Sequence, residues 1–429
     1  MDFKFEKWQD FNNISVKVSI KRKMYDAILI VEQDKLILRI NMTKDINEWR
    51  NSHKNFNILK GTFLFNNQKI FFINCVFTGH SSHFNCQTGK TENVSSDFII
   101  DRLILDKNLT ISSLNSLKKY SASYKNLDLF TEYAPMMSTL STFNYDENTR
   151  SFKIQTPSYS LIIYFYCRMT ENRLSFSIDR FSHVEFEHNR NISIKKAIEN
   201  IYTFRNFLMI ILKHPLYVQK QTIYIDDNAV ELFDCRTNEY YQENADLEEK
   251  IFHRSLKIEK IDNIEVIYNN FIDNYQILYP IIELYYNVTQ FRVPNLTRFV
   301  SATTMLENYS RNYDYSASLA LSKTKNPKSY DANFIDMVIC LINNVNECYN
   351  YSPAEIEKIA ENIKKARIYY IHYKTRQASK PLTNDQQFSY SYFIQDIVLL
   401  NIYKLLGMDI SKYEYVSLNE FYYDKYDLL

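Results

Sequence analysis

The chain has 429 residues, and its 51 basic and 50 acidic side chains leave a formal net charge of only +1 at neutral pH. This balance excludes a global electrostatic pull on nucleic acid, so any RNA-binding surface has to come from a local basic cluster or an assembled groove. Hydrophobic residues make up 45% of the chain, enough for two or three domain cores, whereas only 4 glycines argue against glycine-rich phosphate loops of the P-loop and Rossmann types.

Cysteine usage and apolar segments predict a cytoplasmic protein with reduced thiols. The 6 cysteines are spread thinly along the chain, unlike the dense disulfide framework of a small secreted domain. The N-terminal segment MDFKFEKWQD has no apolar signal core. The longest apolar runs, such as residues 161–167, are too short to span a bilayer, so we expect no membrane association.

The first half of the chain has the pattern of β-strands. Residues 1–190 contain short segments rich in β-branched and aromatic residues, and several of them alternate between apolar and polar positions. Turn-like clusters of Asn, Asp, Ser and Lys separate these segments, which favours an antiparallel sandwich or open barrel. The predicted strands cover residues 16–20, 27–33, 35–42, 61–66, 69–77, 98–105, 160–167, 173–180 and 184–188.

A helix and a further strand complete this region. Ser193 is the expected N-cap of a helix that runs to residue 212 with apolar residues at helical spacing, and a strand over 221–227 follows it. Residues 238–262 are polar and dense in charge, so we interpret them as a linker. The predicted fold is therefore α+β and multidomain: a β-rich, sandwich- or barrel-like N-terminal domain over 1–237 and an all-α bundle over 263–429.

The second half has helical periodicity and clear start and stop signals. Ser352 is placed to cap a helix, Pro353 suits its first turn, and Glu355 completes a capping box. Gly407 is a natural stop for the last helix. The predicted helices cover residues 263–288, 295–311, 331–347, 353–373 and 385–407.

One of these helices carries the pair of residues that points most directly to chemistry. Arg367 and His372 are separated by four residues, and tyrosines lie between and after them. Arg can hold a phosphate through two parallel hydrogen bonds, and His can move a proton near neutral pH. The neighbouring tyrosines can stack on unpaired bases, and they are Tyr369, Tyr370 and Tyr373. A local basic excess that suits RNA comprises Lys364, Lys365, Lys374, Arg376 and Lys380.

Each of these features also has a purely structural interpretation. Arg367 can bridge a carboxylate on a neighbouring helix, and His372 can be a satisfied, partly buried side chain. A charge run is commonly a solvated helix face. Glu307 can orient Arg367 or His372 across the bundle, or it can pair on the surface with Arg311, four residues further on.

With its surroundings, the Arg-x4-His pair resembles the motif of the HEPN family, a helical family that includes many RNA-cutting toxins and defence proteins. Upstream, FVSATTMLENYSR is similar to the family's helix ending in Leu-Glu, here Leu306 and Glu307, with Tyr309 nearby. Downstream, SYFIQDIVLLNIYKLLG resembles its closing helix. The N-terminal half resembles that of ApeA-type anti-phage HEPN proteins through Trp8, the GTFLF strand at Gly61, and the order of sheet then helix.

The resemblance implies a metal-independent endoribonuclease without cofactors. The RNA's own 2′-hydroxyl would attack, His372 would serve as general base or acid, and Arg367 would neutralise charge on the phosphoryl oxygens. The products would carry 2′,3′-cyclic phosphate and 5′-hydroxyl ends. The resemblance further implies a homodimer with a shared groove, and an N-terminal domain that senses a phage-derived trigger. One departure is Ile368, which stands where these families often have a polar residue.

Two other groups of residues have side chains that suit chemistry. Cys75, His80, His83 and Cys86 are the right ligand types for zinc, but their order is unlike common zinc fingers and Cys75 lies in an apolar strand, so an ordinary loop is expected. The segment EFEH at 185–188 places two glutamates on one face of a strand, which we expect to be an exposed edge strand. The alternative to a nuclease is an inert HEPN protein that only dimerises or binds RNA.

Overall fold

The computed structural model describes residues 8–32, 35–42, 55–85, 90–106, 108–125, 127–130, 149–172, 175–213, 216–235, 258, 261–289, 293–372 and 382–411. The chain divides into two compact units, which are described separately below. The first comprises Met1–Asp128, Tyr133–Tyr202 and Tyr217–Glu249, and the second comprises Leu129–Glu132, Thr203–Leu216 and Lys250–Leu429. The division falls inside helix α3 (Ile194–Leu212), whose residues from Thr203 onward belong to the second unit.

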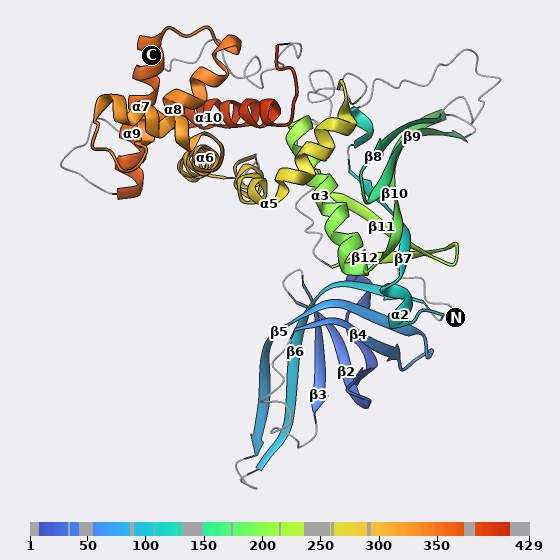
Figure 1. Ribbon diagram of the computed structural model, residues 1–429. Helices are drawn as coiled ribbons and strands as arrows, with labels where there is room; N and C mark the ends of the chain where they lie inside the picture. The colour runs from blue at the N-terminus through green and yellow to red at the C-terminus, as the bar shows by residue number, and fades with distance from the viewer. Residues whose placement is uncertain are drawn as a thin grey trace. The chain divides into compact units, whose positions relative to one another are not determined.

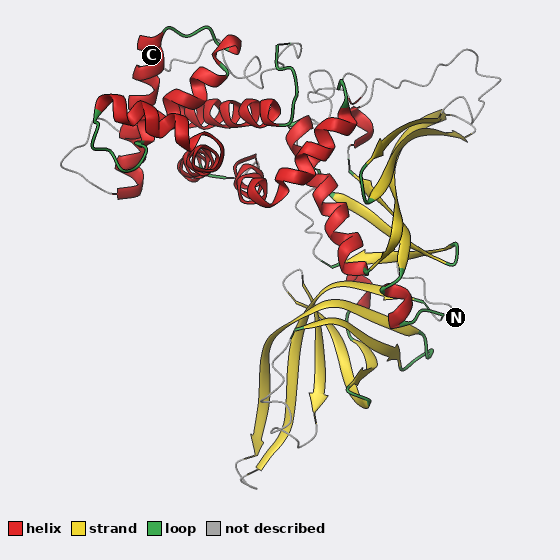
Figure 2. Cartoon of the chain, viewed as in Figure 1, coloured by secondary structure: helices red, strands yellow, loops and turns green. Residues whose placement is uncertain are grey.

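Six antiparallel strands of the first unit close into a barrel (Figures 1 and 2). They follow the order β3-β2-β1-β4-β5-β6, and a further pairing between β3 and β6 closes the ring. This finding settles the predicted choice between a sandwich and a barrel for this part of the chain. The strands are β1 (Ile14–Ile20), β2 (Lys23–Glu32), β3 (Lys35–Met42), β4 (Phe56–Phe63), β5 (Lys69–Asn85) and β6 (Lys90–Leu105).

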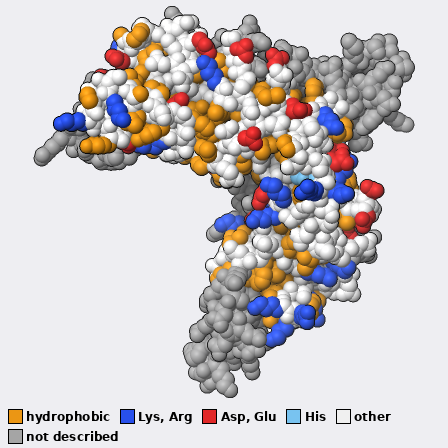
Figure 3. Space-filling view, viewed as in Figure 1, with side chains coloured by type: hydrophobic (Ala, Val, Ile, Leu, Met, Phe, Trp, Pro, Cys, Tyr) orange, Lys and Arg blue, Asp and Glu red, His pale blue; other side chains and the backbone are white. Residues whose placement is uncertain are grey.

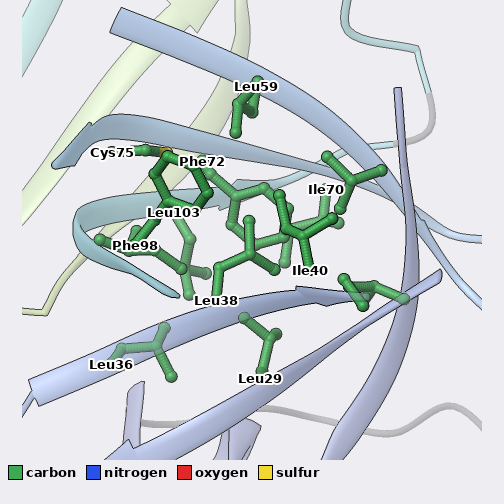
Figure 4. Close-up of a cluster of buried hydrophobic side chains, with 14 of the residues drawn as sticks. Leu29, Leu36, Leu38, Ile40, Leu59, Ile70, Phe72, Cys75, Phe98 and Leu103 are labelled. Carbon is green, nitrogen blue, oxygen red and sulfur yellow. The ribbon is translucent and has the colours of Figure 1, made fainter. Parts of the chain in front are cut away.

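The barrel core follows from the alternation of apolar residues along these strands. Successive side chains of a strand point to opposite faces, so every second residue is turned inward. Leu36, Leu38 and Ile40 of β3 are fully buried and meet Phe72 and Phe98 from β5 and β6 (Figure 4). Burial of this continuous apolar cluster stabilises the barrel at roughly 25 cal/mol per Å² of apolar surface removed from water.

A glycine marks a close approach between neighbouring strands inside the barrel wall. A Cβ atom at Gly61 of β4 would lie 3.0 Å from a ring carbon of Phe72 and 3.2 Å from the carbonyl oxygen of Lys17. The site therefore tolerates no side chain without movement of a neighbour. This is the physical reason for a glycine in the GTFLF segment, whose strand ends at Phe63 rather than at residue 66.

The remaining strands extend the same sheet beyond the barrel, because β12 pairs with β6. Their order is β12-β11-β7-β10-β9-β8. β10 lies between β7 and β9, so the prediction that residues 185–188 form an edge strand is wrong, although Glu185 and Glu187 do share the outward face. The strands are β7 (Leu117–Tyr124), β8 (Thr149–Gln155), β9 (Tyr159–Asn172), β10 (Ser175–Ile192), β11 (Val218–Ile225) and β12 (Asn228–Asp234).

Helix α3 begins where the sequence predicts. The hydroxyl of Ser193 accepts a hydrogen bond of 3.3 Å from the backbone N–H of Lys196, as an N-cap does. In the first unit, the hydroxyl of Tyr124 on β7 donates to the carbonyl oxygen of Ile201 at 2.9 Å. Short helical turns also occur at η1 (Trp8–Phe11), α2 (Ile111–Leu114) and η2 (Leu127–Phe130).

The second unit is built from helices, which confirms the α+β class of the chain. α10 is its central element, since most of its side chains are buried, and it packs against α6. No described helix is long and apolar enough to cross a bilayer. The helices are α5 (Ile264–Thr289), α6 (Asn295–Tyr309), the π-helical turn η5 (Ser310–Asp314), α7 (Tyr315–Lys325), α8 (Phe334–Asn344), η6 (Asn346–Cys348), α9 (Pro353–His372) and α10 (Asn384–Leu405).

The predicted helix signals are present in this unit. Ser352 and Glu355 form the capping box of α9, with the Ser352 N–H donating to the Glu355 carboxylate at 2.8 Å. Gly407 has φ +85° and follows α10. Its N–H and that of Met408 bond to the carbonyls of Lys404 and Tyr403 at 3.0 and 2.9 Å, the Schellman pattern.

Candidate functional site

Helix α9 positions Arg367 beside a buried stripe. Ile356, Ile359, Ile363 and Ala366 recur at helical spacing and are at most 5% exposed, so this face of the helix packs into the bundle. Arg367 follows directly after the last of them, and its side chain is 21% exposed. The guanidinium is thus held at the boundary between core and solvent, within reach of a ligand.

Two side chains from other helices fix the Arg367 guanidinium. Its Nη2 donates a hydrogen bond to Oε2 of Glu307 on α6, and the two groups form an ion pair. The guanidinium also lies over the ring of Phe334, the first residue of α8, at 4.4 Å from the ring centroid. Its Nε is buried and has no hydrogen-bond partner among the described residues. The cation is thus positioned, and one of its donors remains unused.

Glu307 makes both contacts that the sequence left as alternatives. Oε2 accepts from Arg367 across the bundle, and Oε1 accepts from Nε of Arg311, one turn away, at 3.0 Å. One carboxylate therefore links two guanidiniums. The bridge to a carboxylate on a neighbouring helix, foreseen as the structural role of Arg367, is present as well.

A π-helical turn begins three residues after Glu307. η5 covers Ser310–Asp314 and contains Arg311, whose Nη1 lies 3.4 Å from Oδ1 of Asp331. The Tyr315 hydroxyl donates to the same Asp331 oxygen at 2.9 Å, and this hydrogen bond lowers the pKa of the Asp331 carboxyl. Single π turns are rare and are frequently found at functional sites.

The tyrosines near the motif have different environments. The Tyr370 hydroxyl donates to the carbonyl oxygen of Leu382 at 3.1 Å and accepts from Nε2 of Gln387 at 2.8 Å. Burial raises the pKa of Tyr370, which remains a neutral hydrogen-bonding group. Its ring lies edge-on to Phe299 and Tyr369. Tyr370 therefore ties the end of α9 to the start of α10, and its hydroxyl is committed to that role.

Part of the predicted motif falls outside the residues that the structure describes. His372 is the last residue of α9, and only its backbone is described. Lys364 is half-buried, and Lys365 is exposed and pairs with Glu361 at 3.0 Å. In Figure 3, basic and acidic side chains of the helical unit are interspersed with hydrophobic ones on the visible face. The predicted residues Tyr373, Lys374, Arg376 and Lys380 lie outside the described residues.

Cys75 does not have the setting of a zinc ligand. Its side chain is fully buried in the barrel core, and burial raises the pKa of its thiol, which disfavours the thiolate that binds metal. The backbones of His80 and His83 belong to β5, but their side chains and Cys86 lie outside the described residues. The structure thus assigns Cys75 to the apolar core.

The sequence pattern did not predict Asp331 and Phe334 as residues of the site, and it predicted Arg311 only as a surface partner of Glu307. Asp331 and Phe334 are 36 and 33 positions before Arg367, and no spacing rule relates residues in different helices of a bundle. A signal existed only for Arg311, which stands four residues after Glu307.

Comparisons with known proteins support one half of the resemblance. The search of curated proteins finds no match. A solved structure described as MrkH, "A novel c-di-GMP dependence transcription regulatory factor", matches with 9% identity over 44% of this chain and 85% of its own, at a TM-score of 0.15 that is too low to support an argument. The family described as ApeA N-terminal domain 1 matches residues 21–275, which is more than half of the chain. The chain belongs to the ApeA N-terminal domain 1 family.

Proposed function

We propose that this protein is an RNA endonuclease of the HEPN class that acts in anti-phage defence. Membership of the ApeA N-terminal domain family supports the defence role. The observation that carries the nuclease proposal is the held guanidinium of Arg367, with Glu307 and Phe334 fixing it and its Nε unused, on the same helix that ends at His372.

The proposed reaction is transfer of a phosphoryl group within the RNA. The 2′-oxygen attacks phosphorus, the bond to the 5′-oxygen breaks, and 2′,3′-cyclic phosphate and 5′-hydroxyl ends result. Arg367 stabilises the negative charge that builds on the phosphoryl oxygens. His372 takes the proton of the 2′-hydroxyl or gives one to the leaving oxygen.

Helix geometry bears on how these two residues converge. Residues five apart on an ideal α-helix point about 140° away from each other. Both residues lie on α9 (Pro353–His372), so one straight helix brings them together poorly, and pairing with a second copy of the chain would supply the convergence. We further propose a homodimer in which two helical units line one groove. In this scheme the N-terminal unit senses a phage-derived trigger or restrains the nuclease in the cytoplasm.

The test uses purified wild-type protein, Arg367→Ala, His372→Ala and a control, Lys358→Ala, in which an exposed cation about nine residues before Arg367 on α9 is removed. Each protein is incubated with total cellular RNA in EDTA, and the new RNA ends are mapped. We expect cleavage with cyclic-phosphate ends by wild type and control, and a loss of at least about 100-fold in both site variants. Retained cleavage in both site variants would contradict this mechanism.

A second function is favoured by a specific observation. Arg367 is already engaged by Glu307, and Ile368 replaces a polar residue, which suits an inert HEPN protein that binds RNA or dimerises without cleaving. RNA binding by wild type, with no cleavage and no toxicity on overexpression, would support that function instead.

A further inference from the structure

Arg311 and Arg367 both contact the carboxylate of Glu307. Oε1 of Glu307 accepts a hydrogen bond from Nε of Arg311 at 3.0 Å and lies 3.0 Å from its Nη2, and Oε2 of Glu307 pairs with Arg367. Two guanidiniums that share one carboxylate lie side by side, and together with that carboxylate they carry a net charge of +1. This is the arrangement expected where two neighbouring phosphates of one strand are to be held.

The two arginines differ in how firmly they are engaged. The Arg367 side chain is 21% exposed and lies over Phe334, whereas the Arg311 side chain is 42% exposed. The remaining described partner of Arg311 is Asp331, which is 58% exposed and 3.4 Å from Nη1. Exposed ion pairs of this kind are weak because water screens the two charges, so a phosphate can replace Asp331 at little cost.

The backbone offers an independent observation. Arg311 lies in the π-helical turn η5, which follows Glu307 after two residues. A π turn inserts one extra residue into an α-helix, and this distorts the regular hydrogen-bond pattern. Such turns are rare and are frequent at functional sites. The π turn thus contains Arg311, the arginine that shares Glu307 with Arg367.

We infer that Arg311 is a second phosphate-binding residue of this site, which takes the RNA phosphate next to the one bound by Arg367. Glu307 is the positioning residue that keeps the two guanidiniums at one spacing, and Asp331 is the anion that phosphate displaces. The inference rests on the proposed function in that it specifies the substrate as a strand with at least two consecutive phosphates in the groove.

The experiment measures binding of a 2′-O-methyl RNA oligonucleotide, which the proposed reaction does not cleave, as a function of salt concentration. For Arg311→Gln we expect a Kd raised about 10-fold at low salt, and a salt slope (log K against log [salt]) reduced by about 0.7, the value for one lost single-strand phosphate contact. Arg311→Lys should recover part of the affinity. With cleavable RNA, the loss should appear in KM more than in kcat.

A matched control and an opposite variant sharpen the result. Lys196→Gln removes one positive charge from an exposed ion pair with Glu199 in the first unit, and it should leave the slope unchanged. Asp331→Asn removes the competing anion, and it should tighten binding. Urea unfolding of each variant verifies that the protein is folded.

Each outcome has a distinct meaning. An unchanged slope in Arg311→Gln, an equal loss in Lys196→Gln, or no binding by wild type would overturn the inference. If wild type cleaves RNA while Arg311→Gln keeps its slope, the proposed function stands and this inference fails. If wild type binds without cleaving and Arg311→Gln loses the slope, the phosphate site stands and the nuclease fails.

Discussion

The guanidinium of Arg367 has contacts from two other helices, and this shows how much of a short motif's chemistry depends on its neighbours. Glu307 supplies the counter-charge and Phe334 the aromatic face. Half-buried ion pairs of this kind hold a side chain in one rotamer and shield part of it from water. The same contacts would serve a catalytic arginine that must be fixed before substrate arrives and a structural arginine that never meets one.

A second residue-scale feature is a buried histidine in the first unit. His188 on β10 is 7% exposed, and its Nε2 lies 2.9 Å from the Tyr120 hydroxyl and 3.0 Å from the Asn200 amide. The Tyr159 ring stacks on it at 4.8 Å. Burial, with a smaller effect from Lys196, lowers the pKa of His188 to about 4, so the ring is neutral in the folded protein at neutral pH.

This lowered pKa predicts a pH-dependent loss of stability. Unfolded His188 binds a proton below about pH 6.5, but the folded ring does so only near pH 4. This contribution to the free energy of unfolding is fully present above pH 6.5 and is lost as the pH falls toward 4, by roughly 3 kcal/mol. We expect His188→Gln to remove this part of the pH slope in urea unfolding measured from pH 4 to 7.

His183 provides the comparison, because it lies on the outer face of the same strand with 33% of its side chain exposed. Replacement of His183 by Gln should change the pH slope less than the His188 variant does. Identical slopes for wild type and His188→Gln would show that burial of His188 does not couple to folding.

At the scale of elements, a single close contact in the barrel wall makes a sharp prediction. Gly61→Ala places a methyl group about 3 Å from the Phe72 ring and the Lys17 carbonyl, and overpacking of this kind costs about 1–3 kcal/mol. Gly79→Ala is the matched control on β5, since its Cβ would meet no atom within 4 Å. Thermal unfolding should therefore show a lower Tm for the Gly61 variant and a nearly unchanged Tm for the Gly79 variant; equal values would contradict the contact.

Helix ends behave as local chemistry dictates. The capping box of α9, the N-cap of α3 and the Schellman turn after α10 each use residues within a few positions of the helix end. Such signals involve side chains and backbone groups that are neighbours along the chain, so they can be recognised from the sequence before the fold is known. The π turn that follows α6 has no such local signature in this sequence.

At the scale of the whole molecule, the proposed homodimer makes a prediction about mixed subunits. Arg367→Ala and His372→Ala are each expected to be inactive alone. If one groove uses the arginine of one subunit and the histidine of the other, a heterodimer of the two variants retains one intact pair. Refolded or co-expressed mixtures should therefore regain a measurable fraction of wild-type RNA cleavage.

Two controls show whether the recovered cleavage comes from mixed dimers and not from either variant alone. Each variant mixed with itself should remain inactive, and sedimentation velocity should give a dimer for every sample. A monomer, or a mixture with no recovered cleavage from dimers that exchange subunits, would contradict a site shared in this way.

The sequence by itself determined the elements whose apolar pattern is strong. Burial of one face makes apolar residues recur every 2 positions in a strand and about every 3.6 positions in a helix. For this reason the predicted segments overlap the barrel strands β1, β2, β3 and β5 and the helices α5, α6, α8, α9 and α10. The α+β class followed from their order. Three strands and two helices of the described residues lie outside the predicted segments: β7, β8, β12 and α7 are polar or lack a sustained period, and α2 has only 4 residues.

Only the tertiary structure decided the ring closure and the contacts of the site. The pairing of β3 with β6 joins strands 50 and more residues apart, and the ion pair of Glu307 with Arg367 joins helices 60 residues apart. Periodicity records which face of an element is buried but not which partner buries it. The sequence therefore named Arg367 and Glu307 as candidates, and the packing of α6, α8 and α9 determined that they meet, with Phe334 and Arg311 beside them.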